Sequence, residues 1–229
     1  MPFVMPLWAC PEKMVIVLSP LNALEEDQAA RFAKLGLRSV AVNGDTYNAC
    51  IHNSLEKLRY NVIITSPEMC LEHADFRRLL NSTSFAKNIL ALVIDEAHCI
   101  SQWGEKFRKT YSDLGTLRAF VPAKVPVLAT SATLPPVVLS QVQKTLHMDS
   151  ESTYCVNRGT DRPNITWFVR RMTAAKSDLE SLSFLITFDE DGNIQPFRQT
   201  LIFFDDIKVS LQALTWLRER LPDSMHSQI

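Results

Sequence analysis

The chain has 229 residues, of which 46% are hydrophobic and 21% are charged, and its formal net charge at pH 7 is −1. This length suits one large α/β domain or one domain and part of another, and a net charge near zero excludes an overall electrostatic attraction to nucleic acid. The five cysteines are scattered, with no Cys-x-x-Cys pair, which argues against a disulfide framework or a zinc cluster and favours a reducing compartment.

The chain begins with the apolar stretch MPFVMPLWACP. This stretch is too short to span a membrane, and it lacks the basic segment of a signal peptide. We therefore expect an intracellular protein with no membrane partner.

Five apolar runs predict the strands of a parallel sheet. They are short and rich in Val and Ile, and helical segments separate them, which is the pattern of βαβ units. Several show no polar alternation, as expected for strands covered on both faces. The predicted strands are 14–20, 38–44, 61–68, 89–98 and 125–133. The expected fold class is therefore α/β, with helices on both faces of a parallel sheet.

Two of the intervening helices carry clear end signals. In NALEEDQAARFAKLG, Asn22 followed by Glu25 resembles a capping box, and Gly36 suits the C-terminal cap. Pro135 and Pro136 suit the first turn of another helix, which we expect to run to about residue 147.

A second unit is predicted after residue 150. It has a strand at 164–171, a helix, a polar loop, a strand at 200–206 and a final helix. Two strands and two helices are too few for an independent α/β domain. We therefore expect a first domain at 1–150, a linker at 151–163 and the truncated start of a second domain at 164–229.

Small polar signatures follow four of the predicted strands. They are Ser19-Pro20, Ser66-Pro67-Glu68, Asp95-Glu96 and Ser131-Ala132-Thr133. In open α/β sheets the ligand crevice lies at the carboxyl ends of the strands. The sequence therefore predicts a site that these four strand ends share.

The acid pair Asp95-Glu96 suits a nucleoside triphosphatase. The Asp can hold Mg²⁺, and the adjacent Glu can polarise the attacking water. An acid pair alone is more often a loop start or a helix cap, and the hydroxyls of Ser131-Ala132-Thr133 alone suit a turn before Pro135. The following Ala97-His98 changes this balance, because DEAH after an apolar strand matches the Walker B motif of the second helicase superfamily.

The segment after DEAH mixes aromatic and basic side chains. Trp103, Phe107 and Tyr111 interleave with three cations at 106, 108 and 109. Aromatic rings stack on bases and cations follow phosphates, so this composition suits single-stranded nucleic acid. The alternative is a packed aromatic cluster with a solvated charged rim.

Together these motifs resemble the RecQ-like ATP-dependent DNA helicases, and in detail most those of fungi. VIVLSPLNALEEDQ, AVNGDT, VIITSPE, DEAHCISQWG, SATLPP, TDRPNI and TLIFFDDIKVSLQALTWL follow in the family's order. The resemblance implies RecA-like domains, ATP and Mg²⁺ as cofactors, and 3′-to-5′ unwinding in replication, recombination or repair. It also implies a nuclear protein that acts on single-stranded DNA and duplex junctions. The chain departs from the family at Glu105, Lys106 and Lys109, which bears on the coupling of ATP to DNA.

The resemblance also implies roles for individual residues. Asp95, holding Mg²⁺, and Glu96 would bind the nucleotide and act in catalysis. The residues that relay the nucleotide state to DNA would be His98, Gln102, Ser131 and Thr133. The residues that contact DNA would be Ser19, Pro20, Asn22, Gln28, Asn43, Ser66, Pro67, Trp103, Phe107 and Arg108.

No phosphate-binding loop is present, because none of the six glycines is followed by Lys-Ser or Lys-Thr. The family would place that loop just before residue 1, so we expect an internal piece of a helicase that is inactive by itself. Two alternatives stay open. One is a degenerate nucleic-acid-binding module without turnover, and the other is an RNA-directed DEAH enzyme, which the Gln-Trp-Gly-x-x-Phe-Arg segment disfavours.

Overall fold

The structure is a computed structural model that describes residues 2–102, 109–149, 151–172, 178–196 and 198–228. It divides into two compact units, Met1–Asp161 and Arg162–Ile229. Each unit is described by itself.

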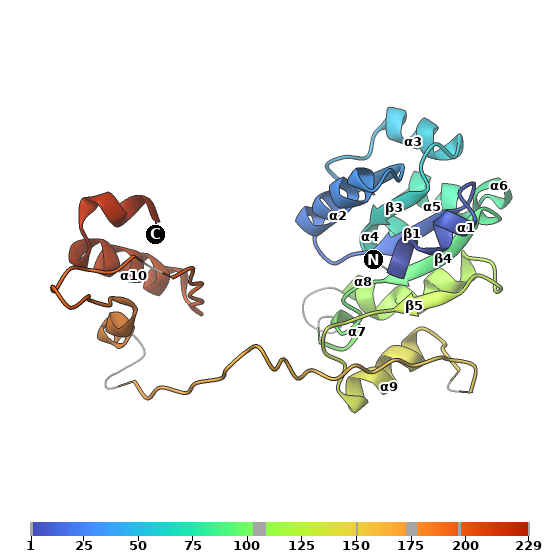
Figure 1. The fold of residues 1–229 in the computed structure, drawn as a ribbon. Coiled ribbons are helices and arrows are strands. Elements are labelled where there is room, and N and C mark those ends of the chain that lie inside the picture. Colours follow the sequence, from blue (N-terminus) through green and yellow to red (C-terminus); the bar gives the residue numbers. More distant parts are fainter. Residues whose placement is uncertain (1, 103–108, 150, 173–177, 197, 229) are drawn as a thin grey trace. The chain divides into compact units, whose positions relative to one another are not determined.

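The first unit contains a five-stranded sheet in which every neighbouring pair of strands is parallel (Figure 1). The strand order is β2-β3-β1-β4-β5. The strands are β1 (Met14–Leu18), β2 (Ser39–Val42), β3 (Val62–Thr65), β4 (Ile89–Ile94) and β5 (Val127–Ala129). All five apolar runs therefore form strands where the sequence predicts them.

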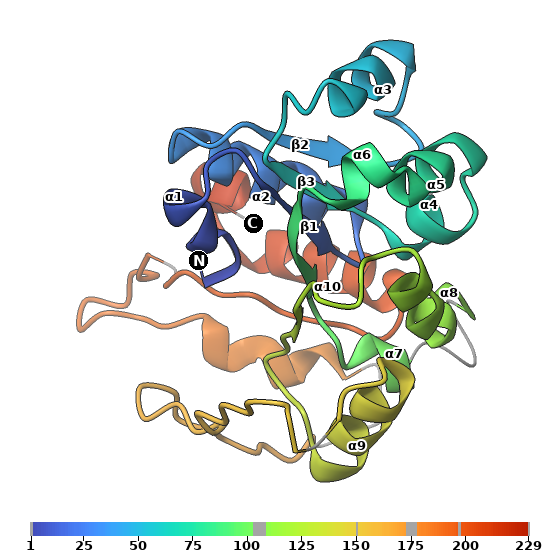
Figure 2. The same cartoon turned by 90° about the vertical axis from the view of Figure 1, so that its right-hand side faces the viewer.

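Helices cover both faces of this sheet (Figure 2). The first-unit helices are η1 (Pro2–Val4), α1 (Pro6–Ala9), α2 (Asn22–Lys34), α3 (Ala49–Glu56), α4 (Pro67–Leu71), α5 (Ala74–Asn81), α6 (Thr83–Ala86), α7 (Cys99–Gln102), α8 (Lys109–Ser112), η2 (Asp113–Ala119) and α9 (Pro136–Thr145). Because side chains alternate along a strand, β1 contributes to two separate cores. Val15 and Val17 pack with Phe32 of α2, whereas Ile16 and Leu18 belong to the core that contains Phe76 of α5. The predicted α/β class is confirmed.

The strands are shorter than the sequence predicts, because polar residues at their carboxyl ends leave the sheet. β3 ends at Thr65, and the hydroxyl of Ser66 then accepts a hydrogen bond from the backbone N–H of Met69. This contact caps α4, whose first residue is Pro67. The strand predicted at 61–68 is therefore a four-residue strand followed by a helix start.

The two end signals predicted for α2 have different outcomes. Gly36 follows the helix with φ of +81°, as its role at the C-terminal end requires. The capping box is wrong: α2 begins at Asn22 itself, and Leu21 occupies the cap position without a side-chain hydrogen bond. The amide of Asn22 instead donates to Asp45 Oδ2 over 3.4 Å.

The second unit is built around one long helix. Its elements are η3 (Leu179–Leu185), α10 (Ile207–Arg220) and η4 (Asp223–Gln228). Trp216 and Leu217 of α10 pack with Leu182 of η3, and the indole of Trp216 donates to Glu180. The helix predicted at the end of the chain is thus present.

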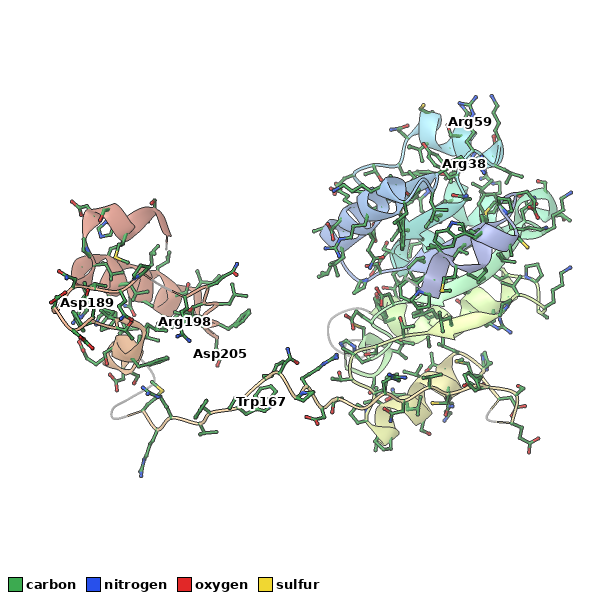
Figure 3. All side chains as sticks on the ribbon, viewed as in Figure 1. Arg38, Arg59, Trp167, Asp189, Arg198 and Asp205 are labelled. Carbon is green, nitrogen blue, oxygen red and sulfur yellow. The ribbon has the colours of Figure 1, made fainter. Side chains whose placement is uncertain are left out.

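The two strands predicted for the second unit, 164–171 and 200–206, are not formed. Neither range has regular structure, and Trp167 (labelled in Figure 3) and Phe203 are more than four-fifths exposed. A strand needs a neighbour for its backbone hydrogen bonds. Among the described residues of this unit the one strand-like pairing is the bridge between Phe188 and Ile194.

No helix in the described part of the chain combines the length and apolar character needed to cross a membrane.

Candidate nucleotide and nucleic-acid site

The carboxyl ends of the parallel strands bring the predicted signatures to one edge of the sheet. Ser19 follows β1, Ser66 follows β3 and the acid pair follows β4. β1 lies between β3 and β4, and β5 brings Ser131 to the other side of β4. The sheet topology therefore collects residues that are more than 100 positions apart in the chain.

Three donors orient the carboxylate of Asp95. Its Oδ1 accepts hydrogen bonds from the backbone N–H of Glu96 at 3.0 Å and from Thr130 Oγ1 at 3.1 Å. Its Oδ2 accepts from Gln28 Nε2 of α2 at 3.0 Å. Hydrogen bonds to a charged acceptor are stronger than those between neutral groups. Asp95 is therefore held in one orientation by β4, β5 and α2.

The backbone of Glu96 is in the left-handed region, with φ of +48°. This conformation is uncommon for a residue with a side chain, and such strain concentrates at functional sites. The carboxylate Oε2 lies 3.1 Å from His98 Nδ1. The turn thus directs Glu96 toward His98 instead of continuing the strand.

His98 links the ends of β4 and β5. Its Nδ1 lies 2.8 Å from Ser131 Oγ, and that hydroxyl donates to the carbonyl of Thr133 at 3.1 Å. The Ser131 hydroxyl has one hydrogen for its two acceptors, so the tautomer of His98 sets which atom donates in the contact between His98 and Ser131. His98 Nδ1 therefore lies within contact distance of both Glu96 and Ser131.

The site retains buried polar atoms that make no hydrogen bond within the described residues. Two of them are Ser19 Oγ and Gln28 Oε1. Buried polar atoms normally have partners, and a bound ligand or water is one explanation of such exceptions. Both atoms belong to residues beside the acid pair, since β1 neighbours β4 and Gln28 contacts Asp95.

The donor set fits Mg²⁺. This ion keeps several waters and is usually held by one or two carboxylates together with substrate phosphates. Asp95 and Glu96 supply two carboxylates at the end of β4. The described residues contain no group of three or more His, Cys, Asp or Glu side chains that would hold a metal by themselves. Asp95 is the carboxylate best oriented for the ion.

A second polar group lies at the ends of β2 and β3. Asn43 Nδ2 donates to Glu25 Oε2 of α2 at 3.1 Å, and both side chains are buried. Nearby, a hollow of about 540 Å³ is lined by Asn22, Gly44, Ser66, Glu68, Met69, Glu72 and His73. Burial raises the pKa of the Cys70 thiol, and the nearby Glu25 and Glu68 raise it further.

Two residues of the site, Thr130 and Glu25, were not predicted from the sequence to belong to it. Thr130 directly precedes the Ser-Ala-Thr signature, so its position at a strand end was a usable signal. Glu25 lies three residues before Gln28 on the same helical face, but nothing in the sequence distinguishes a buried Glu from an exposed one.

Five of the seven described residues that are proposed to contact DNA are buried. The buried ones are Ser19, Pro20, Asn43, Ser66 and Pro67. At these positions the whole residue is buried, so in this structure none of the five presents a surface to DNA. Asn22 is exposed, whereas Gln28 is committed to Asp95.

The remaining predicted residues follow the acid pair. Gln102 is the last residue of α7, and Trp103, Phe107 and Arg108 lie outside the described residues. Their assignment to DNA stays a prediction.

The model of the DEAD/DEAH box helicase family matches residues 2–142. The chain belongs to this family. The match contains the whole sheet and the site described above, so the DEAH signature at the end of β4 is that of a helicase domain.

Within this family the chain is similar to RecQ-type proteins. It is 34% identical over 161 residues to a mouse protein named bifunctional 3′-5′ exonuclease/ATP-dependent helicase WRN, covering 70% of this chain and 11% of that protein. The identity to the ATP-dependent DNA helicase RecQ of Bacillus subtilis is also 34% over 161 residues, covering 69% and 26%. The chain thus spans only about a quarter or less of the length of these helicases.

Two further similarities are to other helicases. A protein of Acanthamoeba polyphaga mimivirus, provisionally named an ATP-dependent RNA helicase, is 32% identical over 160 residues, covering 69% of this chain and 28% of its own length. A crystal structure of the DUF1998 helicase MrfA bound to DNA superposes with a TM-score of 0.47 at 21% identity, covering 62% of this chain and 21% of the other.

Proposed function

We propose that this chain is part of the motor of an ATP-dependent DNA helicase of the RecQ type. The observation that supports this proposal is the acid pair at the end of β4, in which three hydrogen-bond donors orient Asp95. The chain belongs to the DEAD/DEAH box helicase family, in which this acid pair is expected. The 3′-to-5′ polarity, the role in replication, recombination or repair, and the nuclear location follow from the RecQ resemblance.

Asp95 and Glu96 would have different roles at the nucleotide. Asp95 would hold Mg²⁺ together with ATP, and the bound ion would supply positive charge against the negative charge of the phosphates. Glu96 would position the attacking water and accept its proton. The fixed orientation of Asp95 supports the first role, because a preorganised ligand loses little freedom on binding.

His98, Gln102, Ser131 and Thr133 would report the nucleotide state to the DNA. His98 contacts both Glu96 and Ser131, so a change at Glu96 alters a hydrogen bond between the ends of two strands. Such a contact has two arrangements, with His98 Nδ1 directed at one partner or at the other. This alternative is the simplest switch that the site contains.

Single-stranded DNA and duplex junctions would be the substrate. Trp103 and Phe107 would stack on bases, and Arg108 would contact phosphate. The exposed Asn22 would border the same track.

The test is DNA-stimulated ATPase activity of the full protein encoded by the gene. Asp95→Asn and Glu96→Gln should each abolish turnover. Asp113→Asn, which changes an exposed acid of η2 outside the proposed Mg²⁺ site and DNA track, should leave it largely intact. Equal activity of Glu96→Gln and the unaltered protein would contradict the proposal, and stimulation by RNA in place of DNA would contradict the substrate.

The second candidate is a nucleic-acid-binding module without turnover. The observation in its favour is the lack of a phosphate-binding loop among these residues. DNA binding without ATPase activity in the full protein would support this alternative.

A further inference from the structure

The amino-terminal ends of the five strands carry an unusual distribution of charge. The three residues before each strand are 11–13, 36–38, 59–61, 86–88 and 124–126. Each of these five segments contains one cation. The cations are Lys13, Arg38, Arg59, Lys87 and Lys124. The only acid in the five segments is Glu12, so this amino edge has a formal charge of +4.

The opposite edge has the reverse charge. The three residues after each strand are 19–21, 43–45, 66–68, 95–97 and 130–132, and they contain no Lys or Arg. They contain four acids, at 45, 68, 95 and 96. The chain's net charge of −1 thus conceals two edges of opposite sign.

The strand register places the five cations in one row. Ser39 and Val15 are both level with Val62, and Leu92 is level with Val127. Val15 is in turn level with Ala91, so the five cations precede a common level of the sheet by between one and four residues. Strand order places them along this edge in the sequence Arg38, Arg59, Lys13, Lys87 and Lys124. With neighbouring strands about 4.8 Å apart, the row extends over roughly 19 Å.

Contacts between the loops support this arrangement. Lys13 Nζ donates to the carbonyl of Lys87 at 3.1 Å, and the carbonyl of Arg38 accepts from the backbone of Asn61, two residues after Arg59. Arg38 and Arg59 are labelled beside one another in Figure 3. The row is thus a feature of the folded sheet and not only of the sequence.

The charges of the row are available to a partner. Arg38, Arg59, Lys87 and Lys124 are exposed, and Lys13 is half-buried. Within the described part of the chain, none of the five has an ion-pair partner. Isolated surface cations are ordinary, but a row with one unpaired cation before every strand attracts a negatively charged polymer more than a compact anion.

We propose that this amino edge binds the phosphate backbone of a nucleic-acid strand, at a second site separate from the acid pair. A nucleic-acid strand carries one phosphate per about 3.4 Å of helix axis, so about five phosphates fit along the row. Trp8, which is 58% exposed on α1 and five residues before Lys13, offers an aromatic face for a base. This feature favours nucleic acid over an acidic polypeptide. The site does not rest on the proposed function, because it lies at the other edge of the sheet.

The test is binding of fluorescently labelled single-stranded DNA to the 229-residue chain, measured by anisotropy at several salt concentrations. The variant Arg59→Glu/Lys87→Glu/Lys124→Glu reverses three charges of the row, and none of these side chains makes a hydrogen bond in the described structure. The matched control Arg171→Glu/Lys208→Glu/Arg218→Glu reverses three exposed charges in the second unit. Both variants change the net charge by −6. A difference in their DNA affinity therefore depends on where the charges lie and not on the total charge.

The edge variant should bind DNA at least about tenfold more weakly than the control, with a salt dependence shallower by roughly 2 in log–log slope for three lost contacts on a single strand. Equal affinities of the two variants would overturn the proposal, because bulk charge would then explain the binding. Stronger competition by poly-glutamate than by DNA would overturn the assignment to nucleic acid. Unchanged melting temperatures exclude misfolding as the cause, and if the edge variant melts early, Lys87→Glu alone is compared with Lys208→Glu.

Discussion

Gln28 Nε2 donates a hydrogen bond of 3.0 Å to Asp95 Oδ2 and thereby joins α2 to the end of β4. The family resemblance assigns Gln28 to DNA, whereas the structure directs its amide to the carboxylate proposed to hold Mg²⁺. The two assignments predict different effects of mutating Gln28.

Gln28→Ala should weaken the use of Mg²⁺ and spare DNA binding. A hydrogen bond to a charged group contributes about 1.5–3 kcal/mol, so the Mg²⁺ concentration for half-maximal ATPase should rise roughly tenfold or more. Gln28→Glu should be worse, because it places a second negative charge beside Asp95. A Mg²⁺ titration and DNA anisotropy on the same variants decide the matter: lost DNA affinity with an unchanged Mg²⁺ requirement would restore the DNA assignment.

His98→Ala and Ser131→Ala should reduce DNA stimulation of the ATPase to the same extent. Their shared hydrogen bond is about 1 kcal/mol in size, which corresponds to roughly fivefold. Because both changes remove one contact, the double variant should lose little more than either single variant. Thr116→Ala, which removes an exposed hydroxyl that donates to the backbone carbonyl of Asp113, is the control. Fully additive losses would show that His98 and Ser131 act separately.

Trp103→Ala should weaken the binding of single-stranded DNA and leave the melting temperature unchanged. Stacking of one base contributes about 1–3 kcal/mol, so the dissociation constant should rise between about fivefold and 150-fold. Anisotropy and thermal melting of one variant separate this role from the packed alternative. A lower melting temperature with unchanged DNA affinity would identify Trp103 as a core residue.

Tyr47 should make the first unit less stable at high pH. Its hydroxyl lies 2.6 Å from His52 Nδ1, and its ring packs edge-on against His73 and Phe76. Burial, followed by the charges of Asp75 and Glu56, raises the pKa of Tyr47 to about 12.

The unfolded chain releases this proton near the ordinary pKa of about 10, while the folded chain keeps it. The contribution of Tyr47 to stability is therefore complete below pH 10 and is lost as the pH rises toward 12. Urea unfolding at pH 8, 10 and 11.5 should show a steeper loss for the unaltered chain than for Tyr47→Phe. Parallel losses would indicate that Tyr47 ionises equally in both states.

The five cysteines should differ in their reaction with iodoacetamide. Cys50 and Cys155 are exposed and should react in the folded chain. Cys70 and Cys99 are buried, and burial raises the pKa of Cys70, so the reactive thiolate is scarce there. Mass spectrometry before and after unfolding in urea should show Cys70 and Cys99 modified only in the unfolded chain. Early modification of Cys70 would mean that the core around α4 opens readily.

The sequence by itself determined the strands of the first unit and the position of the acid pair. A run such as MVIVL is apolar on both faces, and this local property defines a buried parallel strand wherever the chain later places it. The prediction was wrong for 164–171 and 200–206, which also contain apolar runs, WFV and LIFF. A strand also needs a neighbouring strand, and composition carries no information about the neighbour.

Only the tertiary structure decided which side chains meet. Gln28, Thr130 and Asp95 come together because β1 and β5 flank β4, and the sequence specifies neither this order nor the helical face that α2 turns inward. The same order buries Asn43 against Glu25 and aligns one cation before each strand. Local patterns fix the elements, whereas the order of parallel strands depends on packing between elements far apart in the chain. Whether a residue such as Asn43 is buried or exposed is therefore decided only when the sheet assembles.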